Sequence, residues 1–135
     1  MGWLPFGLWG RRKRILVIED SSTTAQIIVE MLHSFNYDAI VAPTGTQGLE
    51  AIQYQRPDMV LLDVLLPDMN GSIICQRVKA DPATWDIPII YLTSKSETTI
   101  ESGRTMHSAD GYLTKPINRM QLLSRIENIF HRKQK

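Results

Sequence analysis

The sequence predicts an α/β protein in which five helices surround a doubly wound sheet of five parallel strands. The main observation is a pair of apolar runs, residues 15–18 and 59–62, in which hydrophobic side chains follow one another without polar alternation. Continuous apolar runs of this length are typical of parallel strands that helices cover on both faces. A second observation is that strand patterns and helix patterns alternate along the chain at short spacing, as they do in doubly wound sheets.

The first half of the chain contains three of these strands and two of the helices. After the strand at 15–18, Ser21 and Ser22 are good N-caps for a helix. Asn36 tolerates the left-handed conformation in which many helices end. In chain order we then expect a strand at 37–42, a helix at about 46–55 and a strand at 59–63.

The second half completes the alternation. A helix from about residue 72 should end at Asp81, because a residue that precedes proline resists helical geometry. The last helix should begin at the capping-box-like pair Asn118 and Gln121. Its apolar positions, expected to be buried, are Leu122, Leu123, Ile126 and Phe130. Between these helices we expect a strand at 89–92, a helix at 96–107 that is poor in helix formers, and a short strand at 111–113.

Composition narrows the class of protein. With 135 residues, 43% of them hydrophobic, the chain fits one domain with a real core. Fifteen Lys+Arg against fourteen Asp+Glu leave a net charge of +1, which gives no general case for nucleic-acid binding. The single cysteine, Cys75, is expected to be a small buried hydrophobe. No apolar run approaches the ~18 residues of a membrane span, and no signal peptide precedes the domain, so we expect a cytoplasmic protein.

Residues 1–14 stand apart from this pattern. Residues 1–10 hold two of the three tryptophans and no charged residue, and the sequence Arg-Arg-Lys-Arg follows at 11–14. Aromatic residues beside a basic run suit the interface of a membrane. Docking on a partner protein and a flexible tail are the alternatives, and the sequence leaves all three open.

The ends of the expected strands carry the side chains with chemistry. The first strand ends in Glu19 and Asp20, and the third ends in Asp63. The fourth ends in Thr93-Ser94 and the fifth in Thr114-Lys115, whereas the second ends in Ala42-Pro43. Because the carboxyl ends of parallel strands lie along one edge, three acids, hydroxyls and one lysine should meet there. The second strand, which contributes nothing ionisable, is best placed at the rim of the sheet.

This set of side chains suits a phosphoryl group. Three neighbouring carboxylates repel one another unless a cation intervenes, and oxygen ligands in an open cleft suit Mg²⁺. Lys115 adds a positive charge suited to phosphate, and a hydroxyl can donate to another phosphoryl oxygen. A carboxylate can itself act as the nucleophile and form an aspartyl-phosphate. Asp63, between the acidic pair and the lysine in chain order, is the candidate nucleophile.

Four stretches closely resemble the response-regulator receiver domains of two-component signalling. They are ILVIED (15–20), VLLDVLLPDMNG (60–71), IIYLTS (89–94) and GYLTKPI (111–117), in family order and at family spacing. The resemblance covers residues 13–131, which leaves a Trp-rich and basic extension at 1–12 and a short tail at 132–135. It implies a flavodoxin-like sheet with strand order 2-1-3-4-5.

The resemblance also implies the metal site and the phosphorylation site. Asp63 corresponds to the phospho-acceptor, and Glu19 and Asp20 correspond to the acid pair that holds Mg²⁺ with it. The backbone carbonyl of Leu65 would complete the metal ligands. Lys115 corresponds to the lysine that contacts the phosphoryl group, and the bond between Lys115 and Pro116 to the family's cis peptide.

Two further residues correspond to the family's switch. Thr93 resembles the switch hydroxyl and Tyr112 the switch aromatic. In this reading, phosphorylation changes the face made by the last two strands and helices, and that face signals to a protein partner. The helix expected at 96–107, with few helix formers, would be the segment that moves.

The function implied is that of a stand-alone response regulator, phosphorylated on Asp63 by a sensor histidine kinase or a phosphotransfer protein. No output domain is expected after Phe130, and no enzymatic activity beyond Mg²⁺-dependent self-phosphorylation from a phosphohistidine donor and autodephosphorylation. One alternative is an interaction module with the same fold that phosphorylation does not control. Another is an aspartyl-phosphate hydrolase, which would need a second acid near Asp63, and Asp68 is a poor candidate because it lies in a loop.

Overall fold

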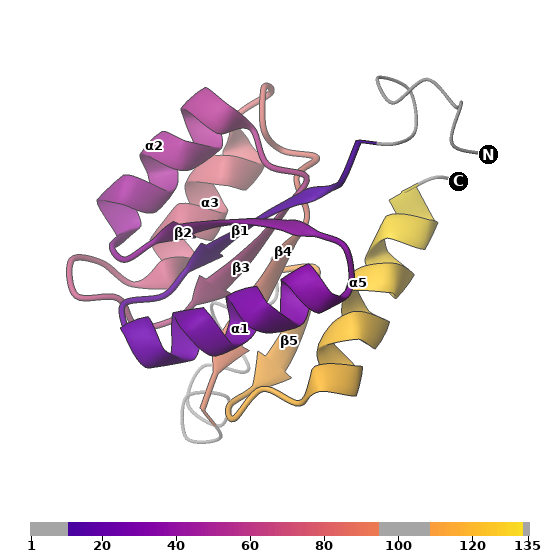
Figure 1. The fold of residues 1–135 in the computed structure, drawn as a ribbon. Helices are drawn as coiled ribbons and strands as arrows, with labels where there is room; N and C mark the ends of the chain where they lie inside the picture. Colours follow the sequence, from indigo (N-terminus) through magenta and orange to yellow (C-terminus); the bar gives the residue numbers. More distant parts are fainter. Residues whose placement is uncertain (1–10, 95–108, 134–135) are drawn as a thin grey trace.

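The sheet has the predicted strands, direction and order. The structure, a computed structural model, describes residues 11–94 and 109–133. All neighbouring strands pair in parallel, in the order β2-β1-β3-β4-β5 (Figure 1). Strand β2 lies at the rim, as expected from its lack of ionisable residues. The strands are β1 (Arg14–Ile18), β2 (Asp38–Ala42), β3 (Met59–Asp63), β4 (Ile89–Thr93) and β5 (Gly111–Thr114).

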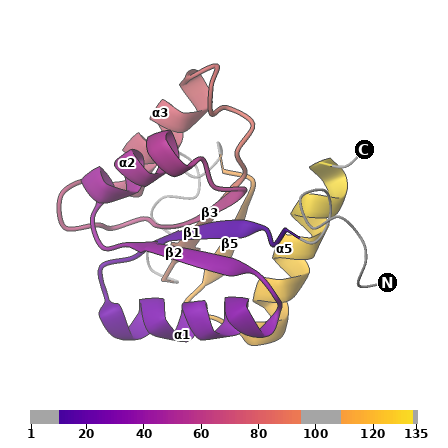
Figure 2. The same ribbon diagram turned by 45° about the horizontal axis from the view of Figure 1, so that its top comes forward.

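Helices cover both faces of this sheet. They are α1 (Ser22–Ser34), α2 (Gly45–Gln55), α3 (Gly71–Ala80) and α5 (Arg119–Lys133). Figure 2 shows α2 and α3 on one side of the sheet and α1 on the other, with α5. The helix expected at 96–107 lies outside the described residues. Among the described helices, none is long and apolar enough to cross a bilayer.

Two hydrophobic layers explain the continuous apolar runs. In β3, Val60 and Leu62 belong to the layer beneath α2 and α3, whereas Met59 and Leu61 belong to the layer beneath α1 and α5. All four side chains have no exposed surface. Burial of a side chain of this size contributes roughly 1.5–3 kcal/mol, so a polar residue at any of these positions would be costly. Cys75 is fully buried in the first layer, as predicted.

Side-chain caps fix the helix ends near the carboxyl edge of the sheet. The hydroxyl of Ser21 accepts from the amide of Thr24 (3.2 Å), and Asn118 accepts from Gln121 (2.9 Å), as predicted. Helix α3 begins slightly earlier than expected, because Asn70 caps it by accepting from the amide of Ser72 (2.8 Å).

One local expectation is confirmed, one needs correction, and one feature had no signal in the sequence. Asn36 has the left-handed conformation expected after α1 (φ 69°). At the end of α2 the same conformation falls on Arg56 (φ 41°), a residue type that gives no such signal. In α5 the third fully packed position is Ile129, whereas Leu123 and Phe130 are only partly buried, because the helix turns them toward its edges.

Candidate functional site

Side chains from three strands meet at the carboxyl edge of the sheet. Glu19 directly follows β1, Asp63 ends β3, and Lys115 directly follows β5. Sheet pairing continues beyond the strands: the amide of Glu19 donates to the carbonyl of Ala42 (3.1 Å), and that of Lys115 to the carbonyl of Thr93 (2.7 Å). The backbone ladder therefore fixes where these side chains begin.

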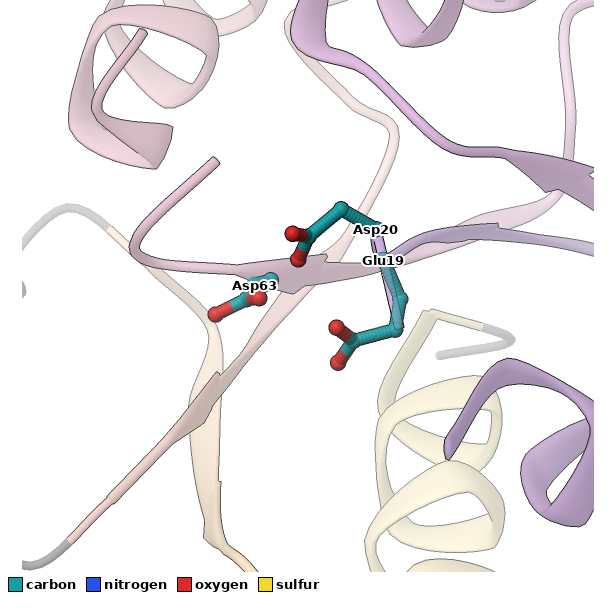
Figure 3. Close-up of side chains that lie close together, drawn as sticks. All are labelled: Glu19, Asp20 and Asp63. Carbon is teal, nitrogen blue, oxygen red and sulfur yellow. The ribbon is translucent and has the colours of Figure 1, made fainter. Parts of the chain in front are cut away.

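Three carboxylates form a compact acidic cluster (Figure 3). One oxygen from each of Glu19, Asp20 and Asp63 lies within 4.8 Å of the others. Glu19 and Asp63 are only 2% and 4% exposed, while Asp20 faces solvent. The sequence prediction that these three acids meet is confirmed by their geometry, and the cluster is open to solvent on the side of Asp20.

Lys115 provides the positive charge of the site. Its ammonium lies 2.8 Å from Oε1 of Glu19 and 3.4 Å from Oδ2 of Asp63. Burial lowers the pKa of this lysine, but the two carboxylates more than offset that effect, so its pKa is raised. The lysine therefore stays charged and bridges two strands of the sheet.

Asp63 has an unusual protonation equilibrium. Burial is the largest cause and the negative charge of Glu19 the next, and together they raise the pKa of Asp63 to about 7. The charge of Lys115 and the amide of Leu65, which donates to Oδ1 of Asp63 (3.2 Å), act in the opposite direction. Among the described residues, the three carboxylates therefore carry more negative charge than Lys115 balances.

The arrangement fits a bound divalent cation. Oε1 of Glu19 is buried and, although 2.8 Å from the Lys115 ammonium, accepts no hydrogen bond from the described residues. Hard oxygen ligands, a solvent-open side and an excess of negative charge are what Mg²⁺ prefers. A cation here would also relieve the repulsion that raises the pKa of Asp63.

Thr93 and Tyr112 lie on neighbouring strands but in different environments. Thr93 is fully buried, and its hydroxyl donates to the carbonyl of Ser94 (3.0 Å). Tyr112 pairs in register with Tyr91 and is 42% exposed, so it is not the core residue that its aromatic ring alone would suggest. The bond between Lys115 and Pro116 is cis, as the resemblance implied.

The loop that follows β3 is held by contacts at both of its ends. Its residue Leu65 is 58% exposed and forms a bridge with Asn70, and the amide of Gly71 donates to the carbonyl of Val64 (2.6 Å). A side chain at Gly71 would meet the carbonyl oxygen of Asp63 at 2.5 Å. Only glycine allows this close approach, which brings the start of α3 back to the end of β3.

Asp68, set aside in the sequence analysis as a loop residue, anchors the middle of this loop. Its carboxylate accepts from the amides of Gly45 (2.8 Å) and Thr46 (2.9 Å) and from the Thr46 hydroxyl (2.8 Å). These bonds lower the pKa of Asp68, with the bond from Gly45 the largest cause. Asp68 thus caps α2 from a distance and ties the loop of Leu65 to that helix. Its signal, an acid five residues after Asp63, has no meaning until α2 is placed.

The fold and this site define a doubly wound α/β protein with an acidic cluster and a lysine at the carboxyl edge. Residues 15–127 match the response regulator receiver domain family. The chain belongs to that family.

Related proteins and solved structures support the same family assignment. The DNA-binding response regulator MtrA of Mycobacterium leprae (strain TN) is 38% identical over 120 residues, 85% of this chain and 50% of MtrA. The chain spans about half the length of the curated relatives that head the matches. A structure described as a response regulator from Chloroflexus aurantiacus J-10-fl superposes with a TM-score of 0.82 at 30% identity, covering 88% of this chain and 98% of that one.

One solved structure bears on the acidic cluster. The receiver domain of sensor histidine kinase PA1611 from Pseudomonas aeruginosa PAO1 was crystallised with magnesium coordinated in its active-site cleft. It superposes with a TM-score of 0.80 at 26% identity, covering 87% of this chain and 97% of that one.

Proposed function

We propose that Asp63 accepts a phosphoryl group from a phosphohistidine of a sensor histidine kinase or phosphotransfer protein, and that the chain signals through phosphorylation-dependent protein contacts. The observation that carries this proposal is the position of Asp63. Its carboxylate is 4% exposed, ends the central strand and lies 3.4 Å from the ammonium of Lys115. Membership of the receiver family supports the same role.

The reaction needs a charged Asp63 and a neutralised phosphoryl group. A carboxylate oxygen of Asp63 attacks phosphorus, the bond between phosphorus and the imidazole nitrogen of the donor breaks, and the nitrogen keeps the electron pair. Lys115 stands ready to pair with a phosphoryl oxygen, since it already contacts Asp63. Holding Asp63 between a lysine and a backbone amide orients its carboxylate before the donor arrives.

Glu19, Asp20 and Asp63, with the backbone carbonyl of Leu65, would hold Mg²⁺. The bound ion would supply positive charge for the carboxylates and for the phosphoryl oxygens. Glu19 is fixed for this task by the amide of Ser21, which donates to its Oε2 (3.1 Å).

The response is proposed to start at Thr93 and Tyr112. Thr93 ends β4 beside the site and is the nearest hydroxyl along that strand, and Tyr112 lies on the neighbouring edge strand. A hydroxyl that turned from the carbonyl of Ser94 toward the phosphoryl group would change the packing around Tyr112. The output face would then be that of the last two strands and helices.

The test is phosphorylation by acetyl phosphate with Mg²⁺, followed by intact mass. We expect one added phosphoryl group, which is lost in alkali and with hydroxylamine as an acyl phosphate should be. Asp63→Asn should abolish the addition, since an amide is not a nucleophile. Asp58→Asn is the matched control, because Asp58 lies just before β3, at the other end of the strand from Asp63, and accepts from the amide of Arg14 (2.8 Å). Undiminished modification of Asp63→Asn would refute the assignment.

The same experiment addresses the alternative of an interaction module that phosphorylation does not control. A folded wild-type chain that binds Mg²⁺ but takes up no phosphoryl group from acetyl phosphate or from a phosphohistidine protein would favour that alternative. Release of free phosphate from small phosphomonoesters would instead favour the hydrolase.

A further inference from the structure

The net charge of +1 hides an uneven distribution of charge along the strands. The acidic cluster of Glu19, Asp20 and Asp63 and the anchor Asp68 lie at the carboxyl edge, where Lys115 pairs with Glu19 and Asp63. At the opposite edge lie five exposed basic residues, which we call the basic end: Arg11, Arg12, Lys13, His131 and Arg132.

Contacts show that these basic residues belong to one surface, although they come from both ends of the described chain. Lys13 lies over the ring of Phe130, 5.4 Å from its centre, which brings the start of β1 beside the last turns of α5. Arg132 lines a small cavity with Asp86 and Pro88, just before β4. Figure 1 shows the start of β1 and the end of α5 on the side of the sheet away from the arrowheads.

The basic end keeps unbalanced positive charge. Nearby acids are largely engaged: Asp38 pairs with Arg12, Asp86 with Arg56, and Asp110 with Lys79. Within the described residues, no acid forms an ion pair with Arg11, Lys13 or Arg132. Two further acids lie at this end: Asp58, which accepts from the amide of Arg14 (2.8 Å), and Glu127, which is close enough to Tyr37 to add to the effect of burial in raising the pKa of that tyrosine.

Aromatic residues accompany these cations. Trp85, on the loop between α3 and β4 and next to Asp86, is 60% exposed. In the sequence, residues 1–10 are uncharged, contain Trp3 and Trp9, and lead directly into Arg11. Tryptophan beside lysine and arginine is the combination that membrane interfaces favour, and stable attachment needs both an apolar and an electrostatic contribution.

We propose that the basic end binds the surface of an anionic membrane, with the exposed side chain of Trp85 in the lipid interface. An anionic surface attracts the basic end and repels the acidic cluster, so the bound chain has one preferred orientation. Asp63 then faces water, where a phosphoryl donor can reach it. This inference goes beyond the proposed function, and its test does not depend on phosphorylation.

The test is flotation of the full chain with vesicles of phosphatidylglycerol or of phosphatidylcholine, at low and high salt. We expect binding to phosphatidylglycerol that high salt removes, and little binding to phosphatidylcholine. The double variant Arg11→Gln and Arg132→Gln leaves the Arg12 ion pair and the Lys13 ring contact in place. It should weaken binding by about fivefold for each cation lost, about 25-fold in all.

Three further variants test the contributions of negative charge and of the exposed tryptophan separately. Glu127→Gln removes one negative charge from the basic end and should strengthen binding to phosphatidylglycerol vesicles. A damaged fold would not produce such a gain. Trp85→Ser should weaken binding, whereas Met120→Ser should not, because Met120 is equally exposed (65%) but lies in the first turn of α5, five residues after Lys115. Since the removed side chains are exposed, the fold should survive each change.

Three results would overturn the proposal. They are absence of flotation with phosphatidylglycerol, equal flotation with both lipids, and flotation that the Arg11 and Arg132 changes leave intact. Binding to duplex DNA without flotation would assign the basic end to nucleic acid instead. Self-association without flotation, measured by sedimentation, would assign it to the acidic edge of a second copy.

Discussion

Both edges of the sheet carry charged groups, but the two edges use them differently. At the carboxyl edge, Glu19 and Asp63 are almost fully buried, and Lys115 contacts both at 2.8 and 3.4 Å. At the basic end, Arg12 and Asp38 are 3.6 Å apart with about half of each side chain exposed. Buried charges perturb one another's protonation, whereas exposed pairs contribute little to stability and act mainly through their long-range field.

The backbone is also packed more closely at the carboxyl edge than at the other edge. At the carboxyl edge, a Cβ atom at Gly71 would meet the carbonyl oxygen of Asp63 at 2.5 Å. At the other edge, a Cβ atom at Gly111 would find nothing closer than 3.9 Å. The chain is packed tightly where Asp63 must be positioned, and has room where β5 begins.

The largest expected effect comes from breaking that close packing. Gly71→Ala should lower the free energy of unfolding by about 2–4 kcal/mol, because the neighbour it meets is backbone and cannot turn away. Gly111→Ala, the matched control, should change it by less than about 1 kcal/mol. Urea denaturation measures both. Equal stability of the two variants would mean that the loop after Asp63 adapts freely.

A second prediction concerns the protonation of Asp63 without metal. The pKa of this carboxyl is near 3.8 in an unfolded chain and about 7 when folded, so the folded state holds its proton more tightly. Wild-type stability should therefore fall as pH rises from about 4 through 7. Asp63→Asn removes this loss and should gain about 1–3 kcal/mol over wild type at about pH 8 relative to about pH 4.

Thermal unfolding at the two pH values, in EDTA, provides the measurement. Asp38→Asn is the comparison at the basic end, where an exposed ion pair is lost and the change should be small at either pH. A stability gain for Asp63→Asn that is the same at both pH values would show that folding does not raise the pKa of Asp63.

A third prediction sharpens the contrast between acids at the two edges. Asp20→Ala should weaken Mg²⁺ binding about tenfold or more, because it removes an exposed oxygen ligand and one negative charge of the cluster. Asp38→Ala should leave binding unchanged. The Mg²⁺-dependent rise in melting temperature reports the affinity. An equal rise for Asp20→Ala and wild type would remove Asp20 from the metal site.

The sheet and the acidic cluster could be predicted because their signals are local. An apolar run such as 59–62 encodes a doubly covered strand, and the edge rule for parallel strands brings Glu19, Asp63 and Lys115 together without any knowledge of the helices. The left-handed Arg56 could not be predicted, because its residue type does not favour that conformation.

The separation of acidic and basic residues between the two edges could also be recognised only from the structure. The basic end joins Lys13 to Phe130 across more than a hundred residues, so a count of net charge could not reveal it. The same holds for Asp68, whose partners are two helix amides that only the tertiary arrangement brings near.

The smallest expected effect concerns Asp68, and it tests whether this residue positions the loop of Leu65 beside the proposed Mg²⁺ site. Asp68→Ala removes three hydrogen bonds to the start of α2 and should weaken Mg²⁺ binding, but less than Asp20→Ala, because Leu65 keeps its bridge to Asn70. Asp68→Asn keeps one acceptor oxygen and should fall between wild type and Asp68→Ala. Thr46→Val removes only the hydroxyl bond and should have the mildest effect of the three. The readouts are Mg²⁺ titration and hydrogen exchange at the amide of Leu65, which donates to Asp63 and should exchange faster in the same order. If all three variants lose thermal stability while Mg²⁺ affinity and Leu65 exchange stay at wild-type values, Asp68 caps α2 and has no part in positioning the site.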